Sequence, residues 1–175
     1  MVLQAYQSFS ITPFKEKISM SKWVFSAFFF TILILVMVTE ARAVDYELPD
    51  TDGQVQSLDQ YKGKWLIVNY WATWCGTCMK ELPELIDFHE NNDVDAVVVG
   101  INFEEIEAKN LKEFVNTKPI PYTVLSTVPV KKTPLGPVPA LPVTYIIDPQ
   151  GNVVAGEIGI VTRENLENYI AQKKG

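Results

Sequence analysis

The sequence predicts an α/β domain with a central mixed β-sheet and helices on both of its faces. Residues 64–70 and 96–102 are apolar runs of strand length, as expected for strands that are covered on both sides. A helical pattern follows each run, and two strand-like segments joined by a turn lie closer to the C-terminus. This alternation of strands and helices is typical of a single compact domain.

The first expected elements follow one another from residue 44 without a repeat or a linker. Turn residues at 50–53 precede a short alternating strand at 54–58. The first apolar run then leads into a helix that ends near residue 91. The second apolar run leads into an amphipathic helix at 105–116, because its apolar residues recur at helical spacing.

The C-terminal part begins with a short strand at 122–125 and a proline-rich stretch at 126–141. Prolines lie in or directly after this stretch at positions 129, 134, 137, 139 and 142. Proline at this density excludes a helix interior, so we expect an extended, ordered loop. A hairpin of strands at 143–147 and 153–157 follows, and a last helix at 162–172 completes the order β-α-β-α-β-β-α.

Residues 1–43 have the pattern of a targeting segment. An apolar run at 23–38 follows Lys22 and precedes the small-x-small triplet at 41–43, as in a secretory signal peptide. The run is shorter than the roughly 20 residues of a usual spanning helix, and both a cleaved signal peptide and a retained membrane anchor fit it. Because a signal peptide normally begins close to its basic residue, we hypothesise that translation starts at Met20.

Composition and charge narrow the class of function. Hydrophobic residues make up 47% of the chain and aromatic residues 11%, which predicts a folded globule. The formal net charge is −6, and the targeting segment holds more basic than acidic residues, so the domain itself is more acidic still. Phosphate contacts need clustered Lys and Arg, so we expect no nucleic-acid partner.

The two cysteines, Cys75 and Cys78, form a Cys-x-x-Cys pair between a predicted strand and a predicted helix. A disulfide across two residues closes almost no loop and stabilises a fold little, so redox chemistry explains the pair better. The amide groups and partial positive charge of a helix N-terminus favour a thiolate at the first position. We therefore expect Cys75 to attack a substrate disulfide and Cys78 to resolve the mixed disulfide. A zinc site needs about four ligands, and two cysteines with one histidine do not supply them, so we expect no metal or cofactor.

The segment WLIVNYWATWCGTCMKELP at 65–83 resembles the active-site segment of the thioredoxin superfamily, and more narrowly the bacterial envelope thiol–disulfide reductases of the TlpA/ResA type. The resemblance extends to LPDTDGQVQSLDQYKGK at 48–64 and LPVTYIIDPQGNVV at 141–154. It implies a thioredoxin-like domain over residues 44–175 and a thiol–disulfide oxidoreductase activity. Exported proteins, apocytochrome c among them, are the implied substrates, and a membrane thiol carrier is the implied electron donor. The implied location is the periplasm or the outer side of the membrane.

The same resemblance assigns roles to further residues. Pro142 matches the cis-proline that faces the cysteine pair in thioredoxin-like folds, and the backbone of Leu141 is expected to pair with a bound peptide. Glu81 matches a glutamate near the thiols that exchanges protons with them; the alternative is a solvated residue in the first helical turn. Trp71 and Trp74 flank the site and are expected to form an apolar platform for the peptide.

One departure from the family leaves the direction of electron flow open. Gly76-Thr77 stands between the cysteines where thioredoxin has Gly-Pro, and this dipeptide affects the reduction potential. A disulfide oxidase or isomerase is therefore an alternative to a reductase, although isomerases of this kind usually add a dimerisation domain. A copper metallochaperone is a weaker alternative, because its relatives use a wider cysteine spacing and a histidine in the second half, and the single histidine is His89. The residue pattern of a peroxidase is absent.

Overall fold

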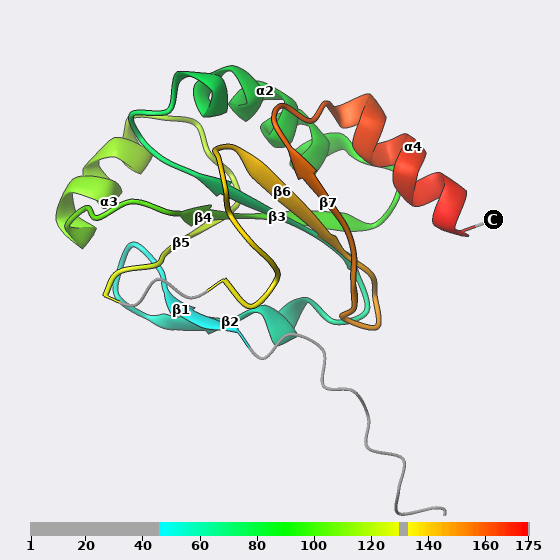
Figure 1. Ribbon diagram of the computed structural model, residues 1–175, viewed down its shortest axis with the longest axis horizontal. Helices are drawn as coiled ribbons and strands as arrows, with labels where there is room; N and C mark the ends of the chain where they lie inside the picture. Colours follow the sequence, from blue (N-terminus) through cyan, green and yellow to red (C-terminus); the bar gives the residue numbers. More distant parts are fainter. Residues whose placement is uncertain (1–45, 130–132, 175) are drawn as a thin grey trace, which may run out of the picture. The chain divides into compact units, whose positions relative to one another are not determined.

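The computed structural model describes residues 46–129 and 133–174, and its centre is a five-stranded sheet in the order β5-β4-β3-β6-β7 (Figure 1). A separate two-stranded sheet, β1-β2, precedes it. The elements in chain order are β1 (Glu47–Pro49), β2 (Val55–Ser57), the 3₁₀ helix η1 (Leu58–Tyr61), β3 (Trp65–Trp71), α2 (Gly76–Asn91), β4 (Ala96–Asn102), α3 (Ala108–Asn116), β5 (Thr123–Ser126), β6 (Val143–Ile147), β7 (Val153–Ile158) and α4 (Arg163–Lys174).

The sheet is mixed because it contains both parallel and antiparallel strand pairs. β3, β4 and β5 are parallel, with Val68 opposite Val99 and Val99 opposite Thr123. β6 pairs antiparallel with β3 on the other side, placing Thr144 opposite Asn69. β7 pairs antiparallel with β6 and forms one edge of the sheet. The central strand β3 therefore has neighbours on both sides, which explains its continuously buried sequence.

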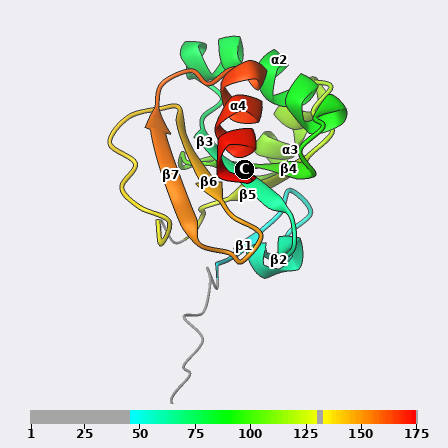
Figure 2. The same cartoon turned by 90° about the vertical axis from the view of Figure 1, so that its right-hand side faces the viewer.

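Different segments of the chain cover the two faces of the sheet (Figure 2). We call one side the helical face, since its core cluster joins residues of β3 and β4 to residues of α2, α3 and α4. The crossovers β3-α2-β4 and β4-α3-β5 both move toward the same edge of the sheet, and right-handed crossovers then place both helices on one face. We call the other side the hairpin face, since its cluster joins the strands to the β1-β2 segment, η1 and the loop at 133–141.

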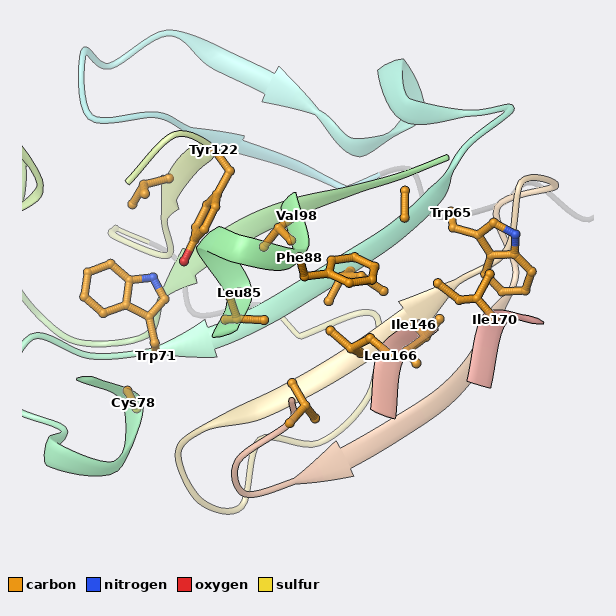
Figure 3. Packing of buried hydrophobic residues seen from close by; sticks show 14 of the residues in the cluster. Trp65, Trp71, Cys78, Leu85, Phe88, Val98, Tyr122, Ile146, Leu166 and Ile170 are labelled. Atoms are coloured by element: carbon orange, nitrogen blue, oxygen red, sulfur yellow. The ribbon is translucent and has the colours of Figure 1, made fainter. Parts of the chain in front are cut away.

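The core of the helical face consists mainly of large apolar side chains from the strands and from the helices that pack on them (Figure 3). Leu85 and Phe88 of α2 and Leu166 and Ile170 of α4 are almost completely buried against the sheet. Burying an aliphatic or aromatic side chain of this size stabilises a fold by roughly 1.5–3 kcal/mol. This packing fixes α2 on the sheet, and with it the position of the cysteine pair at its first turn.

The predicted mixed sheet and the predicted strand and helix order are confirmed. Two details differ. Within the described residues, α2, α3 and α4 share the helical face, and the opposite face carries the short η1. The N-terminal strand is a hairpin of two strands, and α3 begins at Ala108 rather than at residue 105. The segments before α3 and between β1 and β2 are largely polar, so hydrophobic periodicity alone did not define where these elements begin and end.

The predicted targeting segment at 1–43 lies outside the described residues. Within the part of the chain that the structure describes, no helix has the length and apolar composition needed to cross a bilayer.

Candidate active site

The cysteine pair lies at the junction of β3 and α2. Cys75 is the N-cap of α2, and the two sulfurs form a disulfide with the Cα atoms 5.3 Å apart. The backbone amide of Cys78 donates to Cys75 Sγ over 3.1 Å, so the leading sulfur already accepts a helix N-terminal amide. Cys75 is 6% exposed and Cys78 3% exposed. The expected placement of the first sulfur at a helix N-terminus is therefore present.

Glu81 lies one turn after Cys78 and is completely buried on the helical face. Asn69 Nδ2 donates to Glu81 Oε2 over 2.9 Å, and the Val161 amide donates to Oε1 over 2.8 Å. Burial raises the pKa of Glu81 to about 7, although both donated hydrogen bonds act in the opposite direction. The solvated reading of Glu81 is therefore wrong, and the carboxyl group can change its protonation near neutral pH.

The hydrogen-bond network around Glu81 joins three other parts of the chain. Asn69 also donates to Thr144 Oγ1 over 3.0 Å, which joins the middle of β3 to β6. Val161 comes from the segment between β7 and α4, and it was not predicted because a backbone amide leaves no signal in the sequence. Thr144 was not predicted either, although its place directly opposite Asn69 follows from the hairpin register. The buried carboxyl is thus held directly by β3 and by the segment before α4, while β6 binds the Asn69 side chain that donates to it.

Pro142 precedes β6, and the Leu141–Pro142 peptide bond is cis, as predicted. A second cis bond, Val128–Pro129, was not predicted. The Gly159 amide donates to the Pro142 carbonyl over 2.9 Å, which ties the segment after β7 to this turn. Leu141 is partly buried and packs against the cores of both faces. Its role in pairing with a peptide stays a prediction.

The two tryptophans beside the cysteines differ sharply in exposure. Trp74 is 71% exposed, whereas Trp71 is 5% exposed and belongs to the core of the helical face. Trp71 stacks at a tilt on Phe114 of α3, and a methyl group at Gly100 would lie only 2.9 Å from Trp71 Nε1. Trp71 therefore does not form an exposed platform together with Trp74. The alternation of β3 turns its side chain into the helical face.

A carboxylate that the sequence did not single out holds the turn before Cys75. Glu104 Oε1 accepts from the Thr73 amide and from Asn102 Nδ2, both at 2.8 Å, and Glu104 Oε2 accepts from the Thr73 hydroxyl at 3.2 Å. The signal that could have found it is positional, since Thr73 and Glu104 each lie two residues beyond the end of one of two adjacent parallel strands. Their side chains meet because the carboxyl ends of such strands share one edge of the sheet.

His89 makes structural contacts in the core. Its Nδ1 accepts from the Val98 amide over 3.1 Å, and its ring meets the edge of Tyr122. Among the residues that the structure describes, no group of three or more His, Cys, Asp or Glu side chains is placed to hold a metal ion.

Comparisons with known proteins agree with this geometry. The model of the AhpC/TSA family matches residues 39–155. The chain is 32% identical to the thiol-disulfide oxidoreductase ResA of Bacillus cereus over 131 residues, covering 73% of this chain and 74% of that protein. It is 31% identical to ResA of Geobacillus kaustophilus over 150 residues, covering 83% of each.

Solved structures give the same result. A DsbF homologue from Corynebacterium diphtheriae superposes with a TM-score of 0.65 at 26% identity, covering 76% of this chain and 86% of that one. The resemblance to the thioredoxin superfamily drawn from residues 65–83 is thereby confirmed. The chain belongs to the AhpC/TSA family of thioredoxin-like proteins, within which it is related to the ResA thiol–disulfide oxidoreductases.

Proposed function

We propose that this thiol–disulfide oxidoreductase reduces disulfides in exported proteins on the outer side of the cytoplasmic membrane. The observation that supports the proposal most is the placement of Cys75 at the α2 N-cap, where its sulfur accepts the Cys78 amide. A helix N-terminus favours the thiolate, which is the reactive form of cysteine. The apolar run at 23–38 and its small-residue triplet support export, either with cleavage or as an anchor.

The reaction moves two electrons from the dithiol to a substrate disulfide. The Cys75 thiolate attacks one substrate sulfur, the substrate S–S bond breaks, and the other substrate sulfur leaves as a thiolate that takes up a proton. Cys78 then loses its proton and attacks Cys75 Sγ, which breaks the mixed disulfide and releases the second substrate thiol. The enzyme ends with the Cys75–Cys78 disulfide that the structure contains. A membrane thiol carrier restores the dithiol by the same exchange.

Glu81 is the proposed proton acceptor and donor for the pair. Burial raises the pKa of its carboxyl group to about 7, so both protonation states are populated near neutral pH. Such a group can take the proton that Cys78 loses and return it later, whereas an ordinary exposed glutamate stays ionised. The hydrogen bonds from Asn69 and Val161 hold the carboxyl in one orientation.

A substrate peptide is proposed to dock beside the exposed Trp74 and against the turn at Pro142. In this arrangement, the backbone of Leu141 pairs with the peptide as a short added strand. Trp71 supports this region from beneath through its packing on Phe114.

The reduction potential of the pair tests the proposed direction. We expect equilibration of Cys75–Cys78 with glutathione buffers to give about −250 mV or a more negative value, as for a reductase. A value near −120 mV, roughly that of a strong oxidant, would favour the oxidase alternative that Gly76-Thr77 left open.

Trapping tests the roles of the two sulfurs. Cys78→Ser removes the resolving thiol, so we expect mixed disulfides with exported proteins to accumulate on Cys75. Mass spectrometry of the adducts then identifies the substrates, with Cys75→Ser as the control that traps nothing. If Cys75→Ser accumulates adducts and Cys78→Ser does not, the roles are reversed.

A further inference from the structure

The side chain of Glu104 binds the chain just before the reacting sulfur of Cys75. It lies two residues beyond the end of β4, and its carboxylate contacts the turn that carries the chain from β3 into α2. Both polar hydrogens of Thr73 point to it, the amide to Oε1 and the hydroxyl to Oε2. Thr73 is only two residues before Cys75. One side chain thus binds the short segment that determines where the leading sulfur lies.

The carboxylate is itself held from the sheet. Asn102 Nδ2 donates to Glu104 Oε1, and Asn102 is completely buried at the last position of β4. The Asn102 carbonyl accepts from both the amide and the hydroxyl of Thr127, which anchors the same point to the segment after β5. Turning the Asn102 amide would place its oxygen against a carboxylate, so the donor orientation is fixed. Glu104 therefore connects the turn at 72–75 to the end of β4 in the central sheet.

We propose that Glu104 is a positioning residue for the attacking sulfur, acting through its hydrogen bonds to Thr73; the inference rests on the role proposed for Cys75. The α2 N-terminus favours the thiolate only while the sulfur stays beside the helix amides, as it does in the contact with the Cys78 amide. Among the described hydrogen bonds, Cys75 is joined to α2 through the Cys78 and Met79 amides. The preceding residues 72–74 are held by Glu104 and by the bond from the Cys75 amide to the Ala72 carbonyl. Without Glu104, this turn samples positions in which the sulfur leaves the helix terminus.

Replacement by glutamine separates hydrogen bonding from charge. In Glu104→Gln, the amide oxygen can occupy the place of Oε1 and accept from Thr73 and Asn102, as the carboxylate oxygen does. The NH₂ group then occupies the place of Oε2 and donates to the Thr73 hydroxyl, which can accept as well as donate. All three contacts survive while the negative charge is lost. Glu104→Ala removes the contacts and the charge together.

The test measures the alkylation rate of Cys75 against pH in the reduced full-length protein, together with the rate of reduction of a model disulfide. For Glu104→Ala we expect the pH midpoint of alkylation to rise by about half a unit and disulfide reduction to slow about tenfold, since small misplacements of a reacting group have effects of this size or larger. Glu104→Gln should show neither the rise nor the slowing. Thr73→Val, which loses only the hydroxyl contact, should lie between them.

Glu107→Ala is the matched control. Glu107 is exposed at the N-cap of α3 and makes no side-chain capping bond, so its loss removes a nearby charge and leaves the turn untouched. Wild-type alkylation and reduction in Glu104→Ala would overturn the inference, and so would a Glu104→Gln variant that behaves like Glu104→Ala. If Glu104→Ala does not fold by circular dichroism, Thr73→Val decides the matter. A wild-type protein that reduces no disulfide contradicts the proposed function instead.

Discussion

The two faces of the same sheet are built for different purposes. Along β3, the side chains of Val68 and Tyr70 enter the hairpin face, whereas Asn69 between them enters the helical face. On β6, Tyr145 lies on the hairpin face and Thr144 on the helical face. The central strands thus place apolar and aromatic groups on both sides, and on the helical side they add a hydrogen-bonded polar network.

The difference shows how a buried polar network is accommodated in this fold. The polar atoms of Asn69, Glu81 and Thr144 are paired with one another and with the Val161 amide, so their burial leaves few unsatisfied groups. The network lies on the helical face because α2 brings both the cysteines and Glu81 there. The hairpin face has no helix terminus that carries a thiol, and its residues contribute packing. Substitutions on the two faces should therefore affect different observables.

The largest expected effect concerns Glu81→Gln on the helical face. The pKa of Glu81 is about 7 in the folded protein, against an ordinary value of 4.5, so the folded state binds this proton more tightly than the unfolded state. Stability conferred by the protonated group is complete below pH 4.5 and is lost as the pH rises to about 7. Glutamine does not titrate. Relative to wild type, the variant should gain about 3 kcal/mol in free energy of unfolding between these limits.

Urea unfolding of the wild type and of Glu81→Gln at pH 4 and pH 8 measures this change. A constant difference in free energy of unfolding that the glutamine introduces cancels between the two pH values. The pH profile of thiol exchange should also lose a titration near neutrality. Asn69→Ala sharpens the result, since it removes a hydrogen bond that lowers the pKa of Glu81, so its exchange profile should move to higher pH. A stability difference that stays constant between the two pH values would show that Glu81 titrates alike in both states.

A smaller effect is expected from Val68→Ala on the hairpin face. Val68 is completely buried, and its truncation should lower the free energy of unfolding by about 2 kcal/mol through lost burial and the remaining cavity. Because its side chain points away from Glu81, the reduction potential and the pH profile of exchange should remain those of wild type. Denaturant unfolding and exchange kinetics on the same sample check both statements. A displaced pH profile would show that the two faces are coupled through β3.

The sequence was sufficient for features whose signal is local. Apolar runs at 64–70 and 96–102 predicted β3 and β4, and the Cys-x-x-Cys spacing predicted the pair at the α2 terminus. The family resemblance added the cis bond before Pro142. The face assignment of the helices was harder, because it depends on the order of strands in the sheet, which periodicity does not encode.

The sequence did not predict, or predicted only in part, the features that depend on long-range contacts. The degree of burial of Glu81 depends on Val161, which lies 80 positions away and contributes a backbone amide. The burial of Trp71 depends on Phe114 of α3 and on the small Gly100 beside it. Glu104 became visible only once the ends of β3 and β4 were side by side. In each case the partner is specified by the fold and not by a nearby residue.

The smallest expected effect is that of Tyr145→Phe, which tests whether the proline-rich loop belongs to the hairpin face alone. The Tyr145 hydroxyl donates to the Pro137 carbonyl over 2.7 Å and joins this loop to β6. Removing one neutral hydrogen bond of this kind should lower the free energy of unfolding by about 1 kcal/mol. Proteolysis within residues 133–141 should become faster, because the loop opens more often, while disulfide reduction stays unchanged. If disulfide reduction slows as well, the loop at 133–141 contributes to the active site through the turn at Pro142. The hairpin face would then affect activity as well as stability.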